Sequence, residues 1–241
     1  EDRGELQHLL DTNYPFVFIG KRGSDGGRLP YVGADYVAAT ARQVERLVTL
    51  GHERIGYVGP RGTDQPTLDR VDAYRATMKA HGLTVRFVEL DDVPATAAEI
   101  VDQRLTAVVV APENYPEDLT SLAGAEDGVR VPDDVSFLLL GQPHHGRPGG
   151  RRWSGFSIPR EEMGARALVL LSRLVAESGS GRSDRKAARA ARVPEDELHQ
   201  LLECVDVDGE TVAAPPPAPP PAAGPSLQTS ELQSTRETEP A

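Results

Sequence analysis

The stretch LVTLGHERIGYVG (residues 47–59) joins the end of one helical pattern to the whole of one strand pattern. Upstream of it, residues 36–50 carry apolar side chains at helical spacing, which predicts an amphipathic helix with one buried face. Gly51 stands where a glycine commonly ends a helix, and Ile55–Val58 then predicts a strand that closes at Gly59. The chain therefore passes from helix to strand through a short turn, as α/β folds do.

The same alternation of short apolar runs and helical patterns extends in both directions. The predicted extended segments are Phe16–Ile19, Ile55–Val58, Val85–Leu90, Ala107–Val110, Val135–Leu140, Phe156–Pro159 and Leu201–Val207. The predicted helices are residues 36–50, 68–81, 95–104, 119–124 and 161–176. Regular alternation of this kind predicts an α/β fold with parallel sheets and helices on both faces, and the connections are too short for a closed barrel.

Length and composition limit the classes of function. The 241 residues suffice for one large or two modest domains, and no apolar stretch reaches the ~18 residues of a transmembrane helix. Cys204 is the only cysteine, which excludes an intrachain disulfide and fits a reducing, cytoplasmic compartment. The net charge of −11 argues against non-specific nucleic-acid binding. Residue 1 is Glu and no secretory signal opens the chain, so we expect a segment upstream.

Two segments interrupt the alternation. Residues 212–241 are expected to form a disordered proline-rich tail, in which prolines 215–217 and 219–221 favour an extended spacer. A ligand for an SH3-type domain is the alternative to a plain linker. Residues 178–198 are interpreted as a Gly/Ser hinge followed by a basic insertion, for which a solvated face and an anion contact both remain open. The arginines that share one helical face there are Arg185, Arg189 and Arg192.

The sequence carries no recognisable catalytic constellation. It has no phosphate-binding G-x-x-x-x-G-K-[ST] loop, no G-x-G-x-x-G after a strand and no G-x-S-x-G nucleophile elbow. His144 and His145 are adjacent in a loop rich in Gly and Pro, where solvation explains them better than a metal site does. We therefore expect no enzyme activity, no metal and no cofactor. His52, which follows the helix-terminal Gly51, is expected to satisfy the last carbonyls of that helix.

Several segments, taken in order, resemble the effector-binding domain of LacI/GalR-type transcriptional repressors. In that family a helix also ends in Leu-x-x-x-Gly-His-like residues before an Ile-led strand, as residues 47–59 do here. The other similar segments are YPFVFIGKR (14–22), LPYV (29–32) with Asp35, DRVDAY (69–74), KAHGL (79–83), LTAVVVA (105–111), VPDDVSF (131–137), FSIPREEMG (156–164) and LLECVDVDGET (201–211). The resemblance covers residues 14–211 apart from the insertion.

This resemblance implies a periplasmic-binding-protein-like fold of type I. Two doubly wound parallel-sheet subdomains would share three crossovers and clamp a small ligand in the cleft between them. Residues 1–52 with 159–177 would form a partial N-terminal subdomain, and residues 53–158 with 199–211 the C-terminal subdomain. The family's helix-turn-helix, hinge helix and first strand–helix units have no counterpart in this sequence.

The resemblance also proposes ligand-binding residues. Arg70 matches a family arginine that binds ligand hydroxyls or carboxylates, a task suited to a planar guanidinium, although an ordinary helix-start arginine is the alternative. Asp35, Glu113 and Gln142 are the other candidates. Pro112 and Gly141 stand where the family has polar side chains, so sugar recognition of the usual kind is in question and a less polar or anionic effector is open.

The function implied is that of an effector-sensing and dimerisation domain of a LacI-type repressor. A small molecule, sugar-like or other, would alter operator binding by a DNA-binding head that is not in this sequence. The chain would be a cytoplasmic homodimer without a membrane partner. The alternatives are a solute-binding protein of a sugar transporter and a degenerate regulator that needs no effector.

Overall fold

The computed structural model describes residues 14–21, 29–60, 62, 64–88, 93–111, 129–141, 151–179 and 193–217. Four expectations from the sequence fall outside these residues: the helix at 119–124, the loop that holds His144 and His145, the arginine face at 185–192, and the tail from residue 218 onward. Within the described part of the chain, no helix is long and apolar enough to cross a membrane.

The larger of two sheets has six strands in the order β4-β3-β5-β6-β7-β9. Its neighbours pair in parallel except β7 and β9, which are antiparallel. The strands are β3 (Ile55–Val58), β4 (Phe87–Val88), β5 (Ala107–Val110), β6 (Ser136–Leu139), β7 (Ser154–Ser157) and β9 (Val205–Val207). Every residue of β3, β5 and β6 is buried, as expected for central parallel strands covered on both faces.

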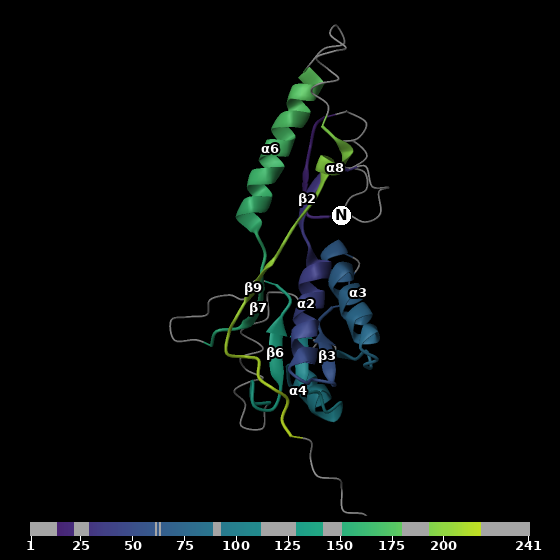
Figure 1. The fold of residues 1–241 in the computed structure, drawn as a ribbon, viewed down its shortest axis with the longest axis vertical. Coiled ribbons are helices and arrows are strands. Elements are labelled where there is room, and N and C mark those ends of the chain that lie inside the picture. Colours follow the sequence, from purple (N-terminus) through teal and green to yellow (C-terminus); the bar gives the residue numbers. More distant parts are fainter. Residues whose placement is uncertain are drawn as a thin grey trace, which may run out of the picture.

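The smaller sheet has three parallel strands in the order β1-β2-β8, namely β1 (Phe18–Ile19), β2 (Tyr31–Ala34) and β8 (His199–Leu202). The helices are α2 (Tyr36–Thr49), α3 (Gln65–Ala80), α4 (Val93–Asp102), α6 (Arg160–Gly179) and α8 (Glu195–Leu198). Figure 1 shows two lobes along the long axis of the molecule. We call β1, β2, β8, α6 and α8 the small lobe, and the large sheet with α2, α3 and α4 the large lobe.

The final expected strand, residues 201–207, is in fact two strands in different sheets. Leu202 ends β8 beside Ala34 of β2, and Val205 begins β9 beside Ser157 of β7. The chain changes lobe between them, at Glu203 and Cys204, where Arg42 of α2 donates a hydrogen bond of 2.6 Å to the Cys204 carbonyl. A short apolar-polar pattern predicts extended backbone but not the sheet that each half joins.

Helix α2 also lies elsewhere than the sequence suggested. The expected subdomain boundary at residue 52 would place this helix with the small sheet, but α2 packs against α3 in the large lobe. Its buried Val44 and Leu47 join one hydrophobic cluster with Tyr57 and Tyr74. The chain therefore crosses between the lobes at Asp35, before the helix begins. The apolar stripe on α2 indicates that one face is buried but not which lobe buries it.

Residues 211–217, which we call the strap, run along the amino-terminal ends of the central strands. Phe137 N–H donates to the Thr211 carbonyl at 2.7 Å, and the Thr211 hydroxyl donates to the Phe137 carbonyl at 2.6 Å. The Ser136 hydroxyl both donates to the Ala213 carbonyl (3.1 Å) and accepts from its N–H (3.0 Å). Part of the segment expected to be a disordered tail is thus a fixed element of the large lobe.

His52 is buried beneath the strap and does not bind the helix carbonyls that the sequence suggested for it. Its Nε2 lies 2.9 Å from the Ala213 carbonyl, and its Nδ1 lies 3.0 Å from the Thr106 hydroxyl. Because a carbonyl only accepts, the Nε2 carries the proton and the Thr106 hydroxyl donates to Nδ1. The backbone N–H of His52, rather than its ring, satisfies the helix by donating to the Leu47 carbonyl at 3.1 Å.

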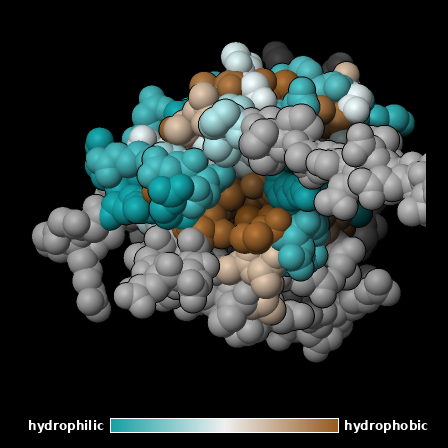
Figure 2. All heavy atoms as spheres, turned by 90° about the horizontal axis from the view of Figure 1, so that it is seen from below, coloured by the Kyte–Doolittle hydropathy of each residue, from teal (hydrophilic) through white to brown (hydrophobic). Residues whose placement is uncertain are grey.

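The face of the large lobe seen in Figure 2 is hollowed, with hydrophobic residues on the floor of the hollow and hydrophilic residues around it. A cavity of about 250 Å³ opens at this amino-terminal edge of the sheet, next to the strap residue Pro216. Its apolar walls come from Ile100, Val101, Leu105, Val129 and Val135.

Gly59 at the end of β3 gives a first testable prediction. Its φ is +138°, and a Cβ added there would lie 1.6 Å from the Ala111 carbonyl oxygen. Gly59→Ala should therefore lower the free energy of unfolding by about 3 kcal/mol, measured by urea denaturation. Gly82→Ala is the control, since Gly82 also has a positive φ (+67°) but has open space around its Cβ position. A smaller loss for Gly59→Ala than for Gly82→Ala would contradict the contact.

His52 gives a second prediction, which concerns pH. Burial lowers the pKa of the His52 ring below its ordinary value of 6.5. Below about pH 6.5 the unfolded chain takes up the proton first, so the free energy of unfolding should fall as pH drops until the lower folded pKa is passed. Urea denaturation between pH 8 and 5 measures this loss. His52→Gln, which keeps an amide for hydrogen bonding, should show a shallower fall, and parallel pH profiles for the two proteins would refute the assignment.

Candidate functional site

The carboxyl ends of the central strands and the amino-terminal ends of α2 and α3 point toward the small lobe (Figure 1). The edge beyond the carboxyl ends of parallel strands is the usual place for ligands in α/β folds. Amino-terminal ends of helices also favour anionic or hydrogen-bond-accepting groups, because their first N–H groups have no partner within the helix. We therefore take the region where these ends meet the small lobe as the candidate site, and we call this region the crevice.

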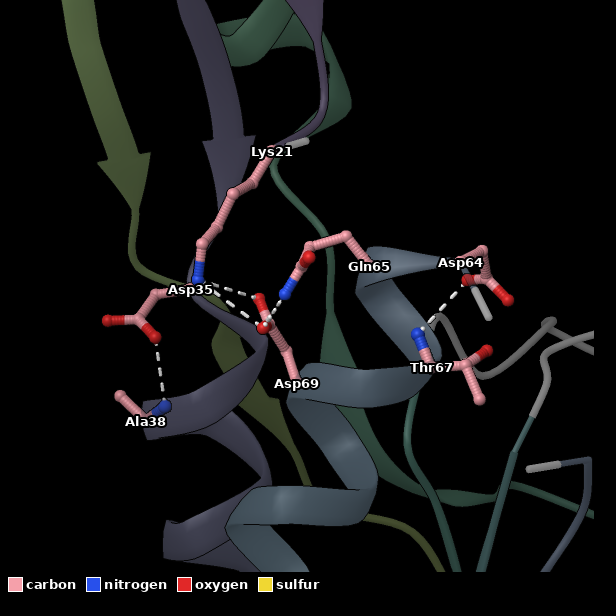
Figure 3. A network of polar contacts seen from close by, with 7 residues as sticks. All are labelled: Lys21, Asp35, Ala38, Asp64, Gln65, Thr67 and Asp69. Carbon is pink, nitrogen blue, oxygen red and sulfur yellow. Dashed lines mark hydrogen bonds and ion pairs between the residues drawn. The ribbon is translucent and has the colours of Figure 1, made fainter. Parts of the chain in front are cut away.

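Asp35 lies at this crevice and caps α2. Its carboxylate accepts a hydrogen bond of 2.9 Å from the Ala38 N–H, and its own N–H donates to the Leu202 carbonyl at 2.8 Å. Figure 3 shows the carboxylate turned back onto the first turn of the helix. The structure thus gives Asp35 a capping role, which the pattern of Asp before a helical run could have indicated. A ligand contact by Asp35 stays a prediction.

Arg70 lies on α3 and is almost wholly buried. Its guanidinium carbon lies 4.2 Å from the centre of the Tyr36 ring, the first residue of α2. The Tyr36 ring in turn lies 6.3 Å from the ring of Phe156 on β7. A cation over an aromatic face is attracted by the ring, more strongly when water is excluded, so Arg70 is held at the crevice by packing as well as charge.

The positive charge of Arg70 affects the pKa of the neighbouring Tyr57. Burial raises the pKa of the Tyr57 hydroxyl to about 12, and Arg70 opposes that rise by favouring the phenolate. Tyr57 is therefore neutral throughout the physiological range. A fixed positive charge in poorly hydrated surroundings can attract a ligand carboxylate, phosphate or hydroxyl more strongly than an arginine in water.

A network of polar contacts, shown in Figure 3, surrounds Asp69, the residue before Arg70 on α3. The ammonium of Lys21, which lies two residues after β1, is 3.3 Å from both carboxylate oxygens of Asp69. The amide of Gln65 donates to the same carboxylate at 2.6 Å. Asp64 caps the helix by accepting from the Thr67 N–H at 3.0 Å. No pattern in the sequence indicates the pair of Lys21 and Asp69, because its two members come from different lobes.

The other two candidates cannot be placed. Glu113 and Gln142 lie outside the described residues, and their roles stay predictions. Among the residues that are described, no three His, Cys, Asp or Glu side chains converge in a way that could hold a metal ion. Cys204 lies buried at a lobe crossing, where burial raises the pKa of its thiol to about 11. At neutral pH it is a thiol and a poor nucleophile.

The comparisons with known proteins agree with this architecture. Residues 44–199 match the model of the periplasmic binding protein-like domain. A curated relative, the HTH-type transcriptional regulator MalR of Streptomyces coelicolor, is 29% identical over 153 residues. That alignment covers 57% of this chain and 42% of the relative, so the chain spans less than half the length of this relative.

Solved structures of regulators have the same fold. The transcriptional regulator CelR–cellobiose complex is 22% identical and superposes with a TM-score of 0.68, covering 88% of this chain and 63% of CelR. A LacI family regulator from Enterococcus faecium with bound ribose is 14% identical, with a TM-score of 0.68 and coverage of 88% and 76%. A sugar-binding LacI family regulator from Escherichia coli, complexed with phosphate, is 15% identical, with a TM-score of 0.65 and coverage of 88% and 73%.

These findings confirm the predicted α/β, periplasmic-binding-protein-like fold class. The relatives named here are transcription regulators. The family model spans more than half of the chain, from the middle of α2 to the start of β8. The chain therefore belongs to the periplasmic binding protein-like domain family.

Proposed function

We propose that the crevice between the two lobes binds a small-molecule effector and that this binding controls a transcription regulator. The observation that carries the proposal is the buried guanidinium of Arg70, stacked on Tyr36 at the edge where both lobes meet. Regulators of similar fold are solved with cellobiose, ribose or phosphate, all of which present oxygens that a guanidinium can bind. The effector is accordingly rich in hydroxyl or acidic oxygens.

The proposed mechanism couples the crevice to the arrangement of the lobes. An effector that contacts both lobes shifts the equilibrium between the closed and the open arrangement by the difference between its affinities for the two forms. In the proposed homodimer, this shift changes the spacing of DNA-binding heads and so the affinity for an operator. A cytoplasmic location fits this role. Residues Asp35, Glu113 and Gln142 stay as proposed further contacts to the effector.

A second candidate function is a regulator that closes without an effector. It is favoured by the ion pair between Lys21 and Asp69, which already joins the two lobes across the crevice. In that case protein contacts rather than a small molecule would set the state of the regulator.

A thermal-shift screen tests the effector proposal. At about one hundred times its dissociation constant, a ligand that binds only the folded state adds about 2.7 kcal/mol to the free energy of unfolding. Cellobiose, ribose, inorganic phosphate, nucleosides and organic acids form the first panel. At least one should raise the melting temperature of the wild-type chain, and Arg70→Met should lose that rise.

Arg75→Met is the matched control. Arg75 lies on the same helix, and its guanidinium also stacks on a ring, 5.0 Å from the centre of Phe87. It is exposed, so its substitution should keep the ligand-induced rise in melting temperature. If no compound raises the melting temperature, or if Arg70→Met retains the rise, the effector proposal is wrong and the effector-independent candidate is favoured.

A further inference from the structure

The ion pair between Lys21 and Asp69 joins two parts of the chain that lie in different lobes. Lys21 lies two residues after the β1 strand of the small sheet, and Asp69 belongs to the second turn of α3 in the large lobe. The ammonium lies 3.3 Å from each carboxylate oxygen, so it sits between them rather than at one side. In Figure 3 the lysine side chain reaches down from the end of its strand to the helix.

From this placement we infer that Lys21 and Asp69 form a latch that keeps the lobes closed when no effector is bound. The inference concerns the regulation of the crevice and rests on the proposed function of that crevice. The contact requires the small lobe to lie against α3, so any opening of the crevice at this place must separate the two charges.

Separating the two charges destabilises Asp69, because its side chain is largely buried. The Asp69 side chain is only 9% exposed, whereas that of Lys21 is 33% exposed. When the ammonium withdraws, Asp69 keeps only the Gln65 amide, of the partners seen here, in a place that water reaches poorly. A carboxylate that loses its counter-ion while it is largely buried is destabilised far more than one at the surface. Salt also screens a half-buried pair less than an exposed one.

Two other polar contacts of the described residues lie at the places where the chain crosses between the lobes. The Asp35 N–H donates to the Leu202 carbonyl, and Arg42 donates to the Cys204 carbonyl. Lys21 follows β1 and lies beside the end of β2, next to the crossing at Asp35, whereas Asp69 lies inside α3. The pair therefore adds a side-chain link between the small sheet and a helix of the large lobe, beside the backbone connections.

The latch adjoins the proposed effector contact. Asp69 and Arg70 are consecutive residues, so the helical turn that Lys21 fixes is the turn that carries the guanidinium. The Lys21 ammonium thereby links the two lobes in part, as a bound effector would. An effector that engages Asp69 through its hydroxyl groups would compete with the lysine for the same carboxylate.

Distance measurements between two spin labels test the latch without any ligand. Ser172→Cys on α6 and Ala76→Cys on α3 place exposed labels in the small and the large lobe, and both changes are small. Cys204 stays unlabelled at neutral pH because it is buried and its thiol pKa is raised. Pulsed electron spin resonance on the full chain should give one narrow distance distribution for the wild-type background. Lys21→Met should broaden it toward longer distances.

Three further variants make the result decisive. Asp69→Asn keeps the shape and should reproduce the broadening, which covers the case that Lys21→Met fails to fold. Lys79→Met is the matched control, because Lys79 is an exposed lysine at the other end of α3 and should leave the distribution unchanged. The exchange Lys21→Asp with Asp69→Lys should restore the narrow distribution at least in part.

Equal distributions for the wild-type background, Lys21→Met and Asp69→Asn would overturn the latch. That outcome leaves the effector proposal intact, because the thermal-shift screen depends on Arg70 and a ligand rather than on the unliganded distance. The converse outcome is that no compound raises the melting temperature while the narrow distance distribution depends on Lys21. That outcome would support the latch and favour closure without an effector.

Discussion

The backbone hydrogen bond from Asp35 to Leu202 fastens together two places where the chain passes from one lobe to the other. Residue 35 follows the central strand of the small sheet, and residue 202 ends its last strand. The bond thus lets α2 leave toward the large lobe while β8 continues toward β9 alongside it. This pairing fixes the residue that caps α2. It thereby also places Tyr36, the first residue of α2, under the guanidinium of Arg70.

The interior of the large lobe shows how polar groups are accommodated in a sheet covered on both faces. The Tyr74 hydroxyl accepts from the Arg86 N–H at 3.0 Å and lies 3.0 Å from the Ile55 carbonyl and 2.9 Å from the Arg86 carbonyl. The Thr211 hydroxyl likewise accepts from the Ser154 N–H at 3.0 Å while it donates to Phe137. Buried hydroxyls therefore connect strand ends that the ladder of the sheet leaves unpaired.

Local patterns in the sequence predicted local structure well. The apolar run Ala107–Val110 is a buried strand with the expected bounds, and the helix expected at 36–50 ends one residue earlier. The strand Tyr31–Ala34 was missed because it is short and contains Gly33, which weakens a strand pattern. Helix α3 begins at Gln65 rather than 68, since Asp64 caps it and Pro66 suits a first turn.

What the sequence could not predict depends on contacts between distant residues. Arg70 was proposed from a resemblance, but nothing in its neighbourhood indicated that Tyr36 would lie under its guanidinium. The pair of Lys21 and Asp69, 48 residues apart, exists only because two lobes meet there. The division of residues 201–207 between two sheets has the same origin, because an alternating pattern is compatible with either sheet.

The strap has a consequence for how the protein is made. His52 precedes the first strand of the large sheet, yet its ring is satisfied by the carbonyl of Ala213, 161 residues later. The ribosome synthesises the chain from its amino-terminal end. The ring of His52 and the hydroxyl of Ser136 therefore have no strap to bind until residue 213 has emerged. Such a long separation between partners also slows folding, because the closure entropy of the loop precedes the gain from the contact. The large lobe therefore completes its interior only after residue 213 has been synthesised.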